Sequence, residues 1–457
     1  MADLVVRGGT VLTPDGPVLT DVHVTGGVIS ALGPAEPATE EVDATGLWVL
    51  PGAVDAHVHS RDPGQPEKED FASLTAAAAA GGVTTVVDMP NTFAAVDSAD
   101  RLVEKAAAVV ARARVDFALW GLIRSSSRPE ELVGMLEAGA AGLKAYLGYA
   151  FRTDLAQVVY APKAAGADLE APPGYGTLAR LGPALAEAGA LVATHAEDPE
   201  VLLALARPLR TYADLLAARP AVAEAAAVAA LGELALATGL EVRLVHLSSA
   251  AGLAAAEAAR TRGAALQLET CPQYVWLSEA YAERLGGLLK MYPPVRTAAD
   301  LEALREGLRS GAIGSLATDH APHTDVEKVG VSFEAALPGS PGVQSLYVAA
   351  LELARRLGDP WQAATWVAEG PARALRLAPR KGSIAIGADA DLVLIDPAGE
   401  TVVTPETQHS RQRHSALTGL RFGIAVRAVW SRGELVARDG EVLAAPGRGR
   451  FIRPLPV

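Results

Sequence analysis

The chain has 457 residues, of which 50% are hydrophobic and 20% are charged, and its formal net charge is −13. This composition excludes a disordered chain and allows a large buried core. The acidic balance argues against nucleic acid and anionic membrane surfaces as partners, and no run of about 18 unbroken apolar residues predicts a membrane span.

Rare residue types and the start of the sequence indicate a cytoplasmic protein. The chain opens with the charged strand pattern Met1-Ala-Asp-Leu-Val-Val-Arg rather than with a signal peptide. A single cysteine, Cys271, rules out an internal disulfide framework, which suits a reducing cytoplasm. There are only nine histidines and seven lysines, so the placement of each is informative.

The two ends of the chain share a strand-rich pattern. Residues 1–50 contain short alternating strands separated by Gly/Pro turns, and residues 376–457 repeat that style. Neither end carries the long helical runs of the middle. We therefore expect both termini to pair into one small β-sandwich domain.

Residues 51–375 alternate short apolar runs with Ala-, Leu-, Glu- and Arg-rich stretches of helical period. Eight such runs predict an α/β fold, a (β/α)8 TIM-like barrel beside the split β domain. The Pro/Gly-rich segment 161–176 is too irregular for a barrel element and is interpreted as an insertion or lid. The predicted strands are 52–59, 83–88, 115–122, 142–147, 191–195, 242–247, 265–269 and 313–319.

Polar side chains recur where these strands end, which is the catalytic face of a barrel. His57 and His59 lie two apart on the first strand, so both imidazoles share a face and could bind one metal ion. Lys144, on the fourth strand, is open to two interpretations. It is either a snorkelling or ion-paired lysine, or an amine that burial deprotonates and carbon dioxide carbamylates. The fifth, sixth and eighth strands end at His195, His246 and Asp319.

Taken together, these residues predict a metal-dependent hydrolase. Imidazole nitrogens combined with carboxylate oxygens suit zinc or a similar divalent ion. Such an ion lowers the pKa of bound water to about 7 and supplies a hydroxide nucleophile.

Long motifs surround the same residues. They are Pro51-Gly-Ala-Val-Asp-Ala-His-Val-His, Thr194-His-Ala-Glu-Asp, His246-Leu-Ser-Ser, Glu269-Thr-Cys-Pro-Gln-Tyr and Ala317-Thr-Asp-His-Ala-Pro-His. With these motifs the chain resembles the amidohydrolase superfamily, and within it the cyclic amidohydrolases dihydroorotase, allantoinase and hydantoinase. The resemblance runs nearly end to end.

The resemblance implies two divalent metal ions, zinc above all, and a small cyclic amide as substrate. The histidines of the first strand would bind the more buried ion with Asp319, the other two would bind the second ion, and Lys144 would bridge both as N6-carboxylysine. A hydroxide between the metals would attack the ring amide, with Asp319 as general base and then general acid. A homodimer or homotetramer is also implied. The metal ligands would be His57, His59, Lys144, His195, His246 and Asp319.

Three further residues bear on which ring is hydrolysed. Arg61, Asn91 and His323 resemble the dihydroorotase clamp for a substrate carboxylate, since a planar guanidinium binds a carboxylate bidentately. In the alternative, Arg61 pairs with Asp62 or Glu67 and Asn91 is a turn residue. With the clamp preferred, we expect dihydroorotate as the ring, in a reaction reversible with N-carbamoyl-aspartate.

Other positions favour allantoinase or hydantoinase (dihydropyrimidinase), which stay as alternatives. Tyr149, five residues after Lys144, matches a tyrosine that hydantoinases use near the oxyanion, although packing at the barrel mouth explains it equally well. Gln273 is hydantoinase-like, and segment 211–220 is allantoinase-like. A non-catalytic interaction protein on the same barrel is disfavoured because the chain keeps all six ligands.

Overall fold

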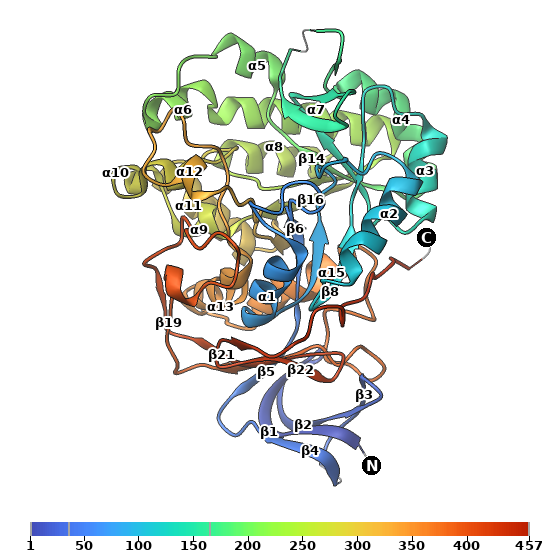
Figure 1. Ribbon diagram of the computed structural model, residues 1–457, viewed down its shortest axis with the longest axis vertical. Helices are drawn as coiled ribbons and strands as arrows, with labels where there is room; N and C mark the ends of the chain where they lie inside the picture. Colours follow the sequence, from blue (N-terminus) through green and yellow to red (C-terminus); the bar gives the residue numbers. More distant parts are fainter. Residues whose placement is uncertain (1, 35–36, 164–165, 456–457) are drawn as a thin grey trace.

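Parallel strands separated by helices make up the upper part of the molecule in Figure 1. The computed structural model describes residues 2–34, 37–163 and 166–455. Every stretch predicted as a strand of residues 51–375 contains one, and neighbouring strands pair in parallel. These strands are β6 (Ala53–Val58), β7 (Val83–Asp88), β8 (Asp116–Leu119), β9 (Gly121–Leu122), β10 (Leu143–Tyr146), β14 (Leu191–His195), β15 (Glu241–Leu244), β16 (Leu266–Thr270) and β17 (Ser315–Leu316).

The strands form two sheets, β6-β7-β8 and β9-β10-β14-β15-β16-β17, that meet at two places. At the first, β8 ends at Leu119 and β9 begins at Gly121, so one segment runs through both sheets. At the second, Val58 bridges His320, and the His59 N–H donates to the His320 carbonyl at 2.8 Å. The first strand and the segment after the last strand therefore lie side by side.

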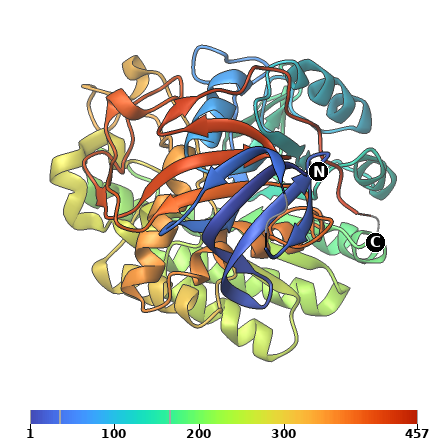
Figure 2. The same cartoon turned by 90° about the horizontal axis from the view of Figure 1, so that it is seen from below.

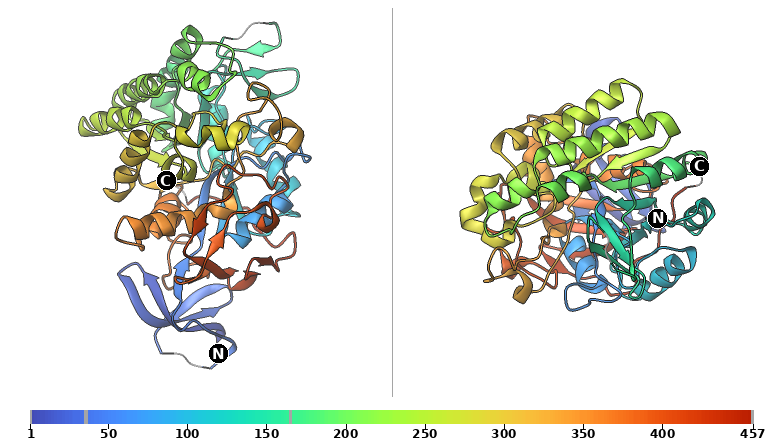
Figure 3. Two further views of the ribbon diagram at one scale, coloured as in Figure 1. Left: turned by 90° about the vertical axis from the view of Figure 1, so that its left-hand side faces the viewer. Right: turned by 90° about the horizontal axis from the view of Figure 1, so that it is seen from above.

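Helices cover the outside of these strands, as both views of Figure 3 show. Their starts follow the local sequence. Asp70 caps α1 (Phe71–Ala80) by accepting from the Ser73 N–H, and the Ser249 hydroxyl caps α8 (Ala250–Thr261) in the same way. The Ala-rich runs form helices because alanine is the strongest helix former. The other long helices are α2 (Ala99–Val110), α3 (Pro129–Glu137), α4 (Tyr175–Glu187), α7 (Ala221–Thr238), α11 (Ala298–Arg309) and α13 (Leu346–Arg356).

Short helices lie in the connections between the longer elements. They are α5 (Pro199–Ala204), α6 (Tyr212–Ala218), α9 (Pro272–Trp276), α10 (Ala282–Leu285), α12 (Asp325–Lys328), α14 (Gln362–Ala364) and α15 (Gly370–Ala374).

One stretch, Tyr212–Thr238, is long and apolar enough to cross a membrane by length and composition alone. It comprises α6 and α7, and α7 packs against α4 and α8 in the outer layer. Glu224 of α7 is buried and accepts a hydrogen bond from the Ser248 N–H at 2.9 Å. Neighbouring helices therefore cover part of this stretch, and 39% of its most apolar window is buried.

Both termini contribute to one nine-stranded sheet below the parallel strands (Figure 2). β5 (Trp48–Pro51) pairs with β1 (Ala2–Thr13) and with β18 (Leu392–Asp396), which confirms that the two ends pair. Hydrogen bonds join all these strands in one sheet, so the predicted sandwich is not confirmed. The domain boundaries after residues 50 and 375 stay predictions. The other strands are β2 (Gly16–Thr25), β3 (Val28–Leu32), β4 (Ala38–Asp43), β21 (Ala425–Ser431), β22 (Glu434–Arg438) and β23 (Glu441–Val442), and β19 (Thr401–Val402) pairs with β20 (Arg421–Phe422) separately.

An antiparallel insertion follows the strand that carries Lys144. β11 (Tyr149–Arg152) pairs with β12 (Gln157–Tyr160) and β13 (Leu169–Glu170). The insertion therefore begins at Tyr149, earlier than the predicted segment 161–176, of which residues 164 and 165 lie outside the described residues. Its role as a lid stays a prediction.

Candidate metal centre

The polar residues singled out in the sequence meet in one cavity at the carboxyl ends of the parallel strands. The cavity has a volume of about 180 Å³, below the roughly 300–1,000 Å³ usual for drug-sized ligands. Its size suits a small ring rather than a polymer. All ten predicted site residues line it: His57, His59, Arg61, Asn91, Lys144, Tyr149, His195, His246, Asp319 and His323.

Backbone conformation sets three of these residues apart. His246 and Asp319 follow β15 and β17 and have φ angles of 44° and 49°, while Arg61 has a φ of 59°. Side chains other than glycine rarely adopt this left-handed region, and such residues cluster at functional sites. The strained turns at the strand ends therefore mark the same cavity as the side-chain chemistry does.

His57, His59 and Asp319 converge on one point. Asp319 Oδ1 lies 3.3 Å from His57 Nε2 and 3.1 Å from His59 Nε2. One ligand atom from each residue lies within 4.8 Å of the other two, which would let the three share a metal ion. Two imidazole nitrogens and a carboxylate oxygen are a donor set that suits zinc.

A second pair of histidines faces each other in the same cavity. His195 Nδ1 lies 3.0 Å from His246 Nε2, and their rings are 4.7 Å apart. Burial, followed by the charge of His195, holds the pKa of His246 well below its ordinary value. Both rings therefore offer neutral nitrogen donors to a cation at neutral pH.

Lys144 lies fully buried on β10, and its Nζ has no hydrogen-bond partner among the residues that the structure describes. Burial lowers its pKa to about 8, although Glu269 and Asp319 oppose that change. An uncharged amine is the form that reacts with carbon dioxide, and a partnerless buried amine is costly unless something completes it. These features fit a carbamylated lysine and disfavour both the snorkelling and the ion-paired interpretation.

Sequence reasoning missed the two carboxylates that orient the histidines. Glu269, at the end of β16, contacts His57 Nδ1 at 2.9 Å through Oε1, while Arg243 Nη2 donates to its Oε2 at 2.8 Å. Although burial opposes ionisation, Arg243 and then His57 hold the pKa of Glu269 at about 2. A carboxylate behind a ligating imidazole fixes its tautomer and aims the other nitrogen at the metal.

The second histidine pair has a matching support. His195 Nε2 lies 3.0 Å from Glu197 Oε2, and Arg219 Nε donates to Glu197 at 3.2 Å. The sequence contains features that could have indicated both carboxylates. Glu197 follows His195 by two residues, and Glu269 is a charged residue at the carboxyl end of a barrel strand.

Replacing Glu269 by Gln should weaken zinc binding by about 10- to 100-fold, because His57 loses the carboxylate that orients it. Competition with a chromophoric chelator measures the affinity. Glu257→Gln, on the exposed face of α8, is the matched control. The melting temperature of the metal-free variant is measured in parallel because Arg243 loses a charged partner. Unchanged zinc affinity would contradict the orienting role.

The proposed clamp residues are partly engaged with the protein. Asn91 Oδ1 accepts from His59 Nδ1 at 2.7 Å, so Asn91 orients a predicted ligand rather than only ending a turn. The alternative pairing of Arg61 with Asp62 is wrong, since Asp62 pairs with Arg112 at 2.8 Å. The described residues give the Arg61 guanidinium one hydrogen bond, from Nε to the Pro322 carbonyl at 3.3 Å.

His323 has no N–H left for a ligand. Burial, followed by the charge of Arg61, lowers its pKa to about 2, so the ring is neutral. Nε2 donates to the Pro338 carbonyl at 2.9 Å, and Nδ1 faces the Lys68 ammonium at 3.4 Å. A neutral imidazole carries a single N–H, and here the protein uses it.

A buried lysine joins two segments that wall the cavity. Lys328 Nζ donates to the carbonyls of Lys290 at 2.8 Å and Leu337 at 2.7 Å, beside the lining residues Met291 and Pro338. Burial, followed by the charge of Lys290, lowers the pKa of Lys328 from 10.5 to about 7.

Lys328→Met should flatten the pH dependence of stability. Between pH 7 and 10.5 the unfolded chain holds a proton on this amine that the folded chain has lost, so stability rises with pH. The variant should lose a slope of up to about 1.4 kcal/mol per pH unit. Urea titrations of both proteins across that window measure the difference. Parallel slopes would contradict a neutral Lys328.

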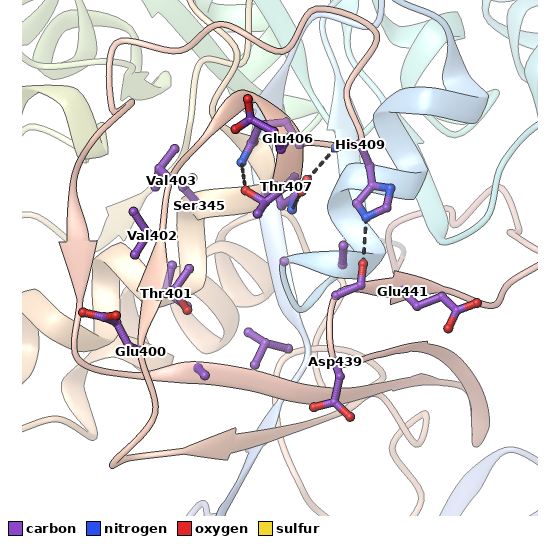
Figure 4. A pocket seen from close by; sticks show the side chains of 18 of the residues that line it. Ser345, Glu400, Thr401, Val402, Val403, Glu406, Thr407, His409, Asp439 and Glu441 are labelled. Atoms are coloured by element: carbon purple, nitrogen blue, oxygen red, sulfur yellow. Dashed lines mark hydrogen bonds between the residues drawn. The ribbon is translucent and has the colours of Figure 1, made fainter.

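A larger cavity of about 560 Å³ lies beside α13 and the C-terminal strands (Figure 4). Its labelled side chains include Ser345, Thr401 and His409, and His409 Nε2 donates to the Gly440 carbonyl at 2.7 Å. It shares no lining residue with the cavity of the predicted ligands. The two cavities are therefore separate.

Comparison with known proteins identifies the class. Residues 48–436 match the model of the amidohydrolase family. The chain belongs to the amidohydrolase family, in its cyclic amidohydrolase branch. Hydrolysis of a cyclic amide is accordingly its class of reaction.

Particular relatives span nearly the whole chain. The allantoinase of Rubrobacter xylanophilus is 40% identical over 465 residues, covering 99% of this chain and 98% of the relative. The dihydroorotase of Mycobacterium tuberculosis is 33% identical over 436 residues, covering 93% and 96%. The solved L-hydantoinase (dihydropyrimidinase) of Arthrobacter aurescens has a TM-score of 0.91 and 28% identity, covering 99% of this chain and all of its own. Allantoinases, rather than dihydroorotases, are thus the more similar relatives, which corrects the sequence-based preference.

Proposed function

We propose that this chain is an allantoinase, which opens the hydantoin ring of allantoin with two divalent metal ions. Zinc is the first candidate for both ions. The observation that carries the reaction is the convergence of His57, His59 and Asp319, with the His195–His246 pair in the same cavity. The similarity to allantoinases supports allantoin as the ring that is opened. This proposal adopts what had been the alternative to dihydroorotate.

The donor sets support one arrangement of metal ligands. His57, His59 and Asp319 would hold one ion, His195 and His246 the other, and Lys144 would bind both as N6-carboxylysine. The Lys144 amine supports this modification, since it has no hydrogen-bond partner in the described part of the chain and a pKa of about 8. When bound, the ions would polarise the amide carbonyl and lower the pKa of a water molecule.

Asp319 would move the proton in the proposed reaction. Although burial opposes ionisation, the facing imidazoles of His57 and His59 hold the pKa of Asp319 well below its ordinary value. Its carboxylate is therefore ionised at neutral pH. It can accept a proton from the attacking water and pass it to the ring nitrogen that leaves.

The free donors around the ring fit a neutral substituent better than a three-residue carboxylate clamp. His323 uses its N–H on Pro338, so it has no donor left for a carboxylate, whereas Asn91 accepts from His59 through its carbonyl oxygen and keeps its NH2 donors. Arg61 keeps its terminal nitrogens, and guanidinium N–H groups donate to a ureido carbonyl as well as to a carboxylate. Allantoin carries a ureido group and no carboxylate.

We also propose that the parallel strands close into the predicted (β/α)8 barrel of residues 51–375. Support comes from the Val58–His320 bridge and from the chain segment shared by β8 and β9. Closure would place all the predicted ligands at one mouth.

Which ring the enzyme opens can be tested by initial rates with one zinc-loaded sample. The substrates to compare are allantoin, hydantoin, dihydroorotate and dihydrouracil. We expect allantoin to have the highest kcat/KM, by at least about tenfold. A preference for dihydroorotate would instead support binding of a substrate carboxylate by Arg61, Asn91 and His323. Absence of hydrolysis of every ring, with zinc bound, would contradict the proposal altogether.

A further inference from the structure

Tyr146 carries a buried hydroxyl for which the described residues provide no partner. The residue is only 6% exposed, its Oη makes no hydrogen bond within the described part of the chain, and it lines the cavity of the metal centre. Buried hydroxyls are nearly always bonded, because an unsatisfied one costs free energy. An exception in a substrate cavity indicates a group that the ligand completes.

The ring of Tyr146 is held in place by its neighbours. It packs with Leu122 and Phe151 in a small apolar cluster, and its centroid lies 5.6 Å from that of Tyr149. Tyr146 follows Lys144 by two residues on β10, so both side chains leave the strand on the same face. Lys144 Nζ lies 4.9 Å from the ring centroid.

The phenol hydroxyl of Tyr146 carries a hydrogen that it can donate to a ligand in this cavity. Arg61 lines the same cavity and offers guanidinium N–H donors beside those of the phenol. Tyr149 differs, because its ring lies 5.2 Å from His195 at the second histidine pair.

We propose that Tyr146 Oη donates a hydrogen bond to the ureido substituent of the substrate, beside Arg61, and so sets the preference for allantoin over unsubstituted hydantoin. This inference rests on the proposed function, because it requires a ring with a polar substituent. A site built to bond such a group disfavours the analogue that lacks it, since the site's donors are then left unpaired.

The test compares Tyr146→Phe with the wild type on allantoin and hydantoin, with zinc content and melting temperature measured on the same samples. We expect kcat/KM to fall about tenfold on allantoin and less than about twofold on hydantoin. Zinc content should not change. The melting temperature should stay equal or rise, because the hydroxyl that is removed has no partner among the residues that the structure describes.

Tyr212→Phe is the matched control. The Tyr212 hydroxyl donates to the Val295 carbonyl at 2.6 Å and does not line the cavity. Its removal should lower the melting temperature and leave both rates unchanged.

The outcomes separate this inference from the proposed function. A wild type that prefers allantoin, paired with a variant that keeps the same preference, would overturn the role of Tyr146 alone. Equal losses on both rings together with less zinc would also overturn it, since the hydroxyl would then support Lys144 instead. A wild type that prefers hydantoin or dihydroorotate would overturn the proposed function, and this inference with it.

Discussion

Replacing Asp319 by Asn is expected to lower kcat for allantoin by at least about a thousandfold. The carboxylate has two tasks here. It faces both His57 Nε2 and His59 Nε2, so in the proposed mechanism it would be a metal ligand and would also accept and return the proton of the reaction. Asparagine keeps the size of the side chain but can do neither task well, because its amide is neutral and a poor base.

Steady-state rates with saturating zinc measure this loss. Asp439→Asn, an exposed aspartate of the C-terminal segment, is the control and should retain full activity. An Asp319→Asn enzyme that keeps more than about a tenth of the wild-type kcat would place the base elsewhere.

Replacing Lys144 by Ala should lower kcat for allantoin by at least about a thousandfold, as for Asp319→Asn, and should reduce the zinc content of the chain. The only exposed lysine in the described part of the chain, Lys163, provides the matched control as Lys163→Ala. Short carboxylic acids added to the Lys144→Ala enzyme should restore part of the rate, because they fill the vacated space and supply the carboxylate oxygens of a carbamate.

Lys144→Met separates a metal-binding role from a structural one. The amine is buried and has no partner among the described residues, so an apolar side chain of similar length should leave the metal-free protein equally or more stable. Thermal melts in the presence of a chelator measure this. A large loss of stability in Lys144→Met, with zinc content unchanged, would make Lys144 a structural residue.

Much of the candidate site could be predicted because its ligands sit at the ends of short apolar strands. His57 and His59 share a strand face by alternation alone, and parallel strands bring His195, His246 and Asp319 to one edge. All five line the same cavity, with Lys144 among them.

What could not be predicted depends on contacts between segments far apart in the sequence. Glu269 lies 212 residues from His57, and only the fold shows which histidine it supports. Asn91 is read naturally as a turn residue until its oxygen is found on His59 Nδ1. The insertion begins earlier than its Pro/Gly content indicates, because Tyr149 and the residues after it form an antiparallel strand.

The relatives favour allantoin over the dihydroorotate ring predicted from the sequence, and the structure offers a physical reason. Arg61 suggests a carboxylate because a guanidinium binds that group most strongly, yet its N–H groups also donate to neutral carbonyl oxygens. The decisive information is which neighbouring donors are free. His323 is not free, because its N–H is bound by Pro338, and that cannot be read from residue types.

Zinc titration of the metal-stripped protein, followed by allantoin hydrolysis, tests the central claim most directly. The stripped chain should be inactive, and its rate should rise with bound zinc until the His57–His59–Asp319 and His195–His246 positions are filled. Full hydrolysis by the stripped chain, or no hydrolysis of allantoin at saturating zinc, would contradict a metal-dependent allantoinase.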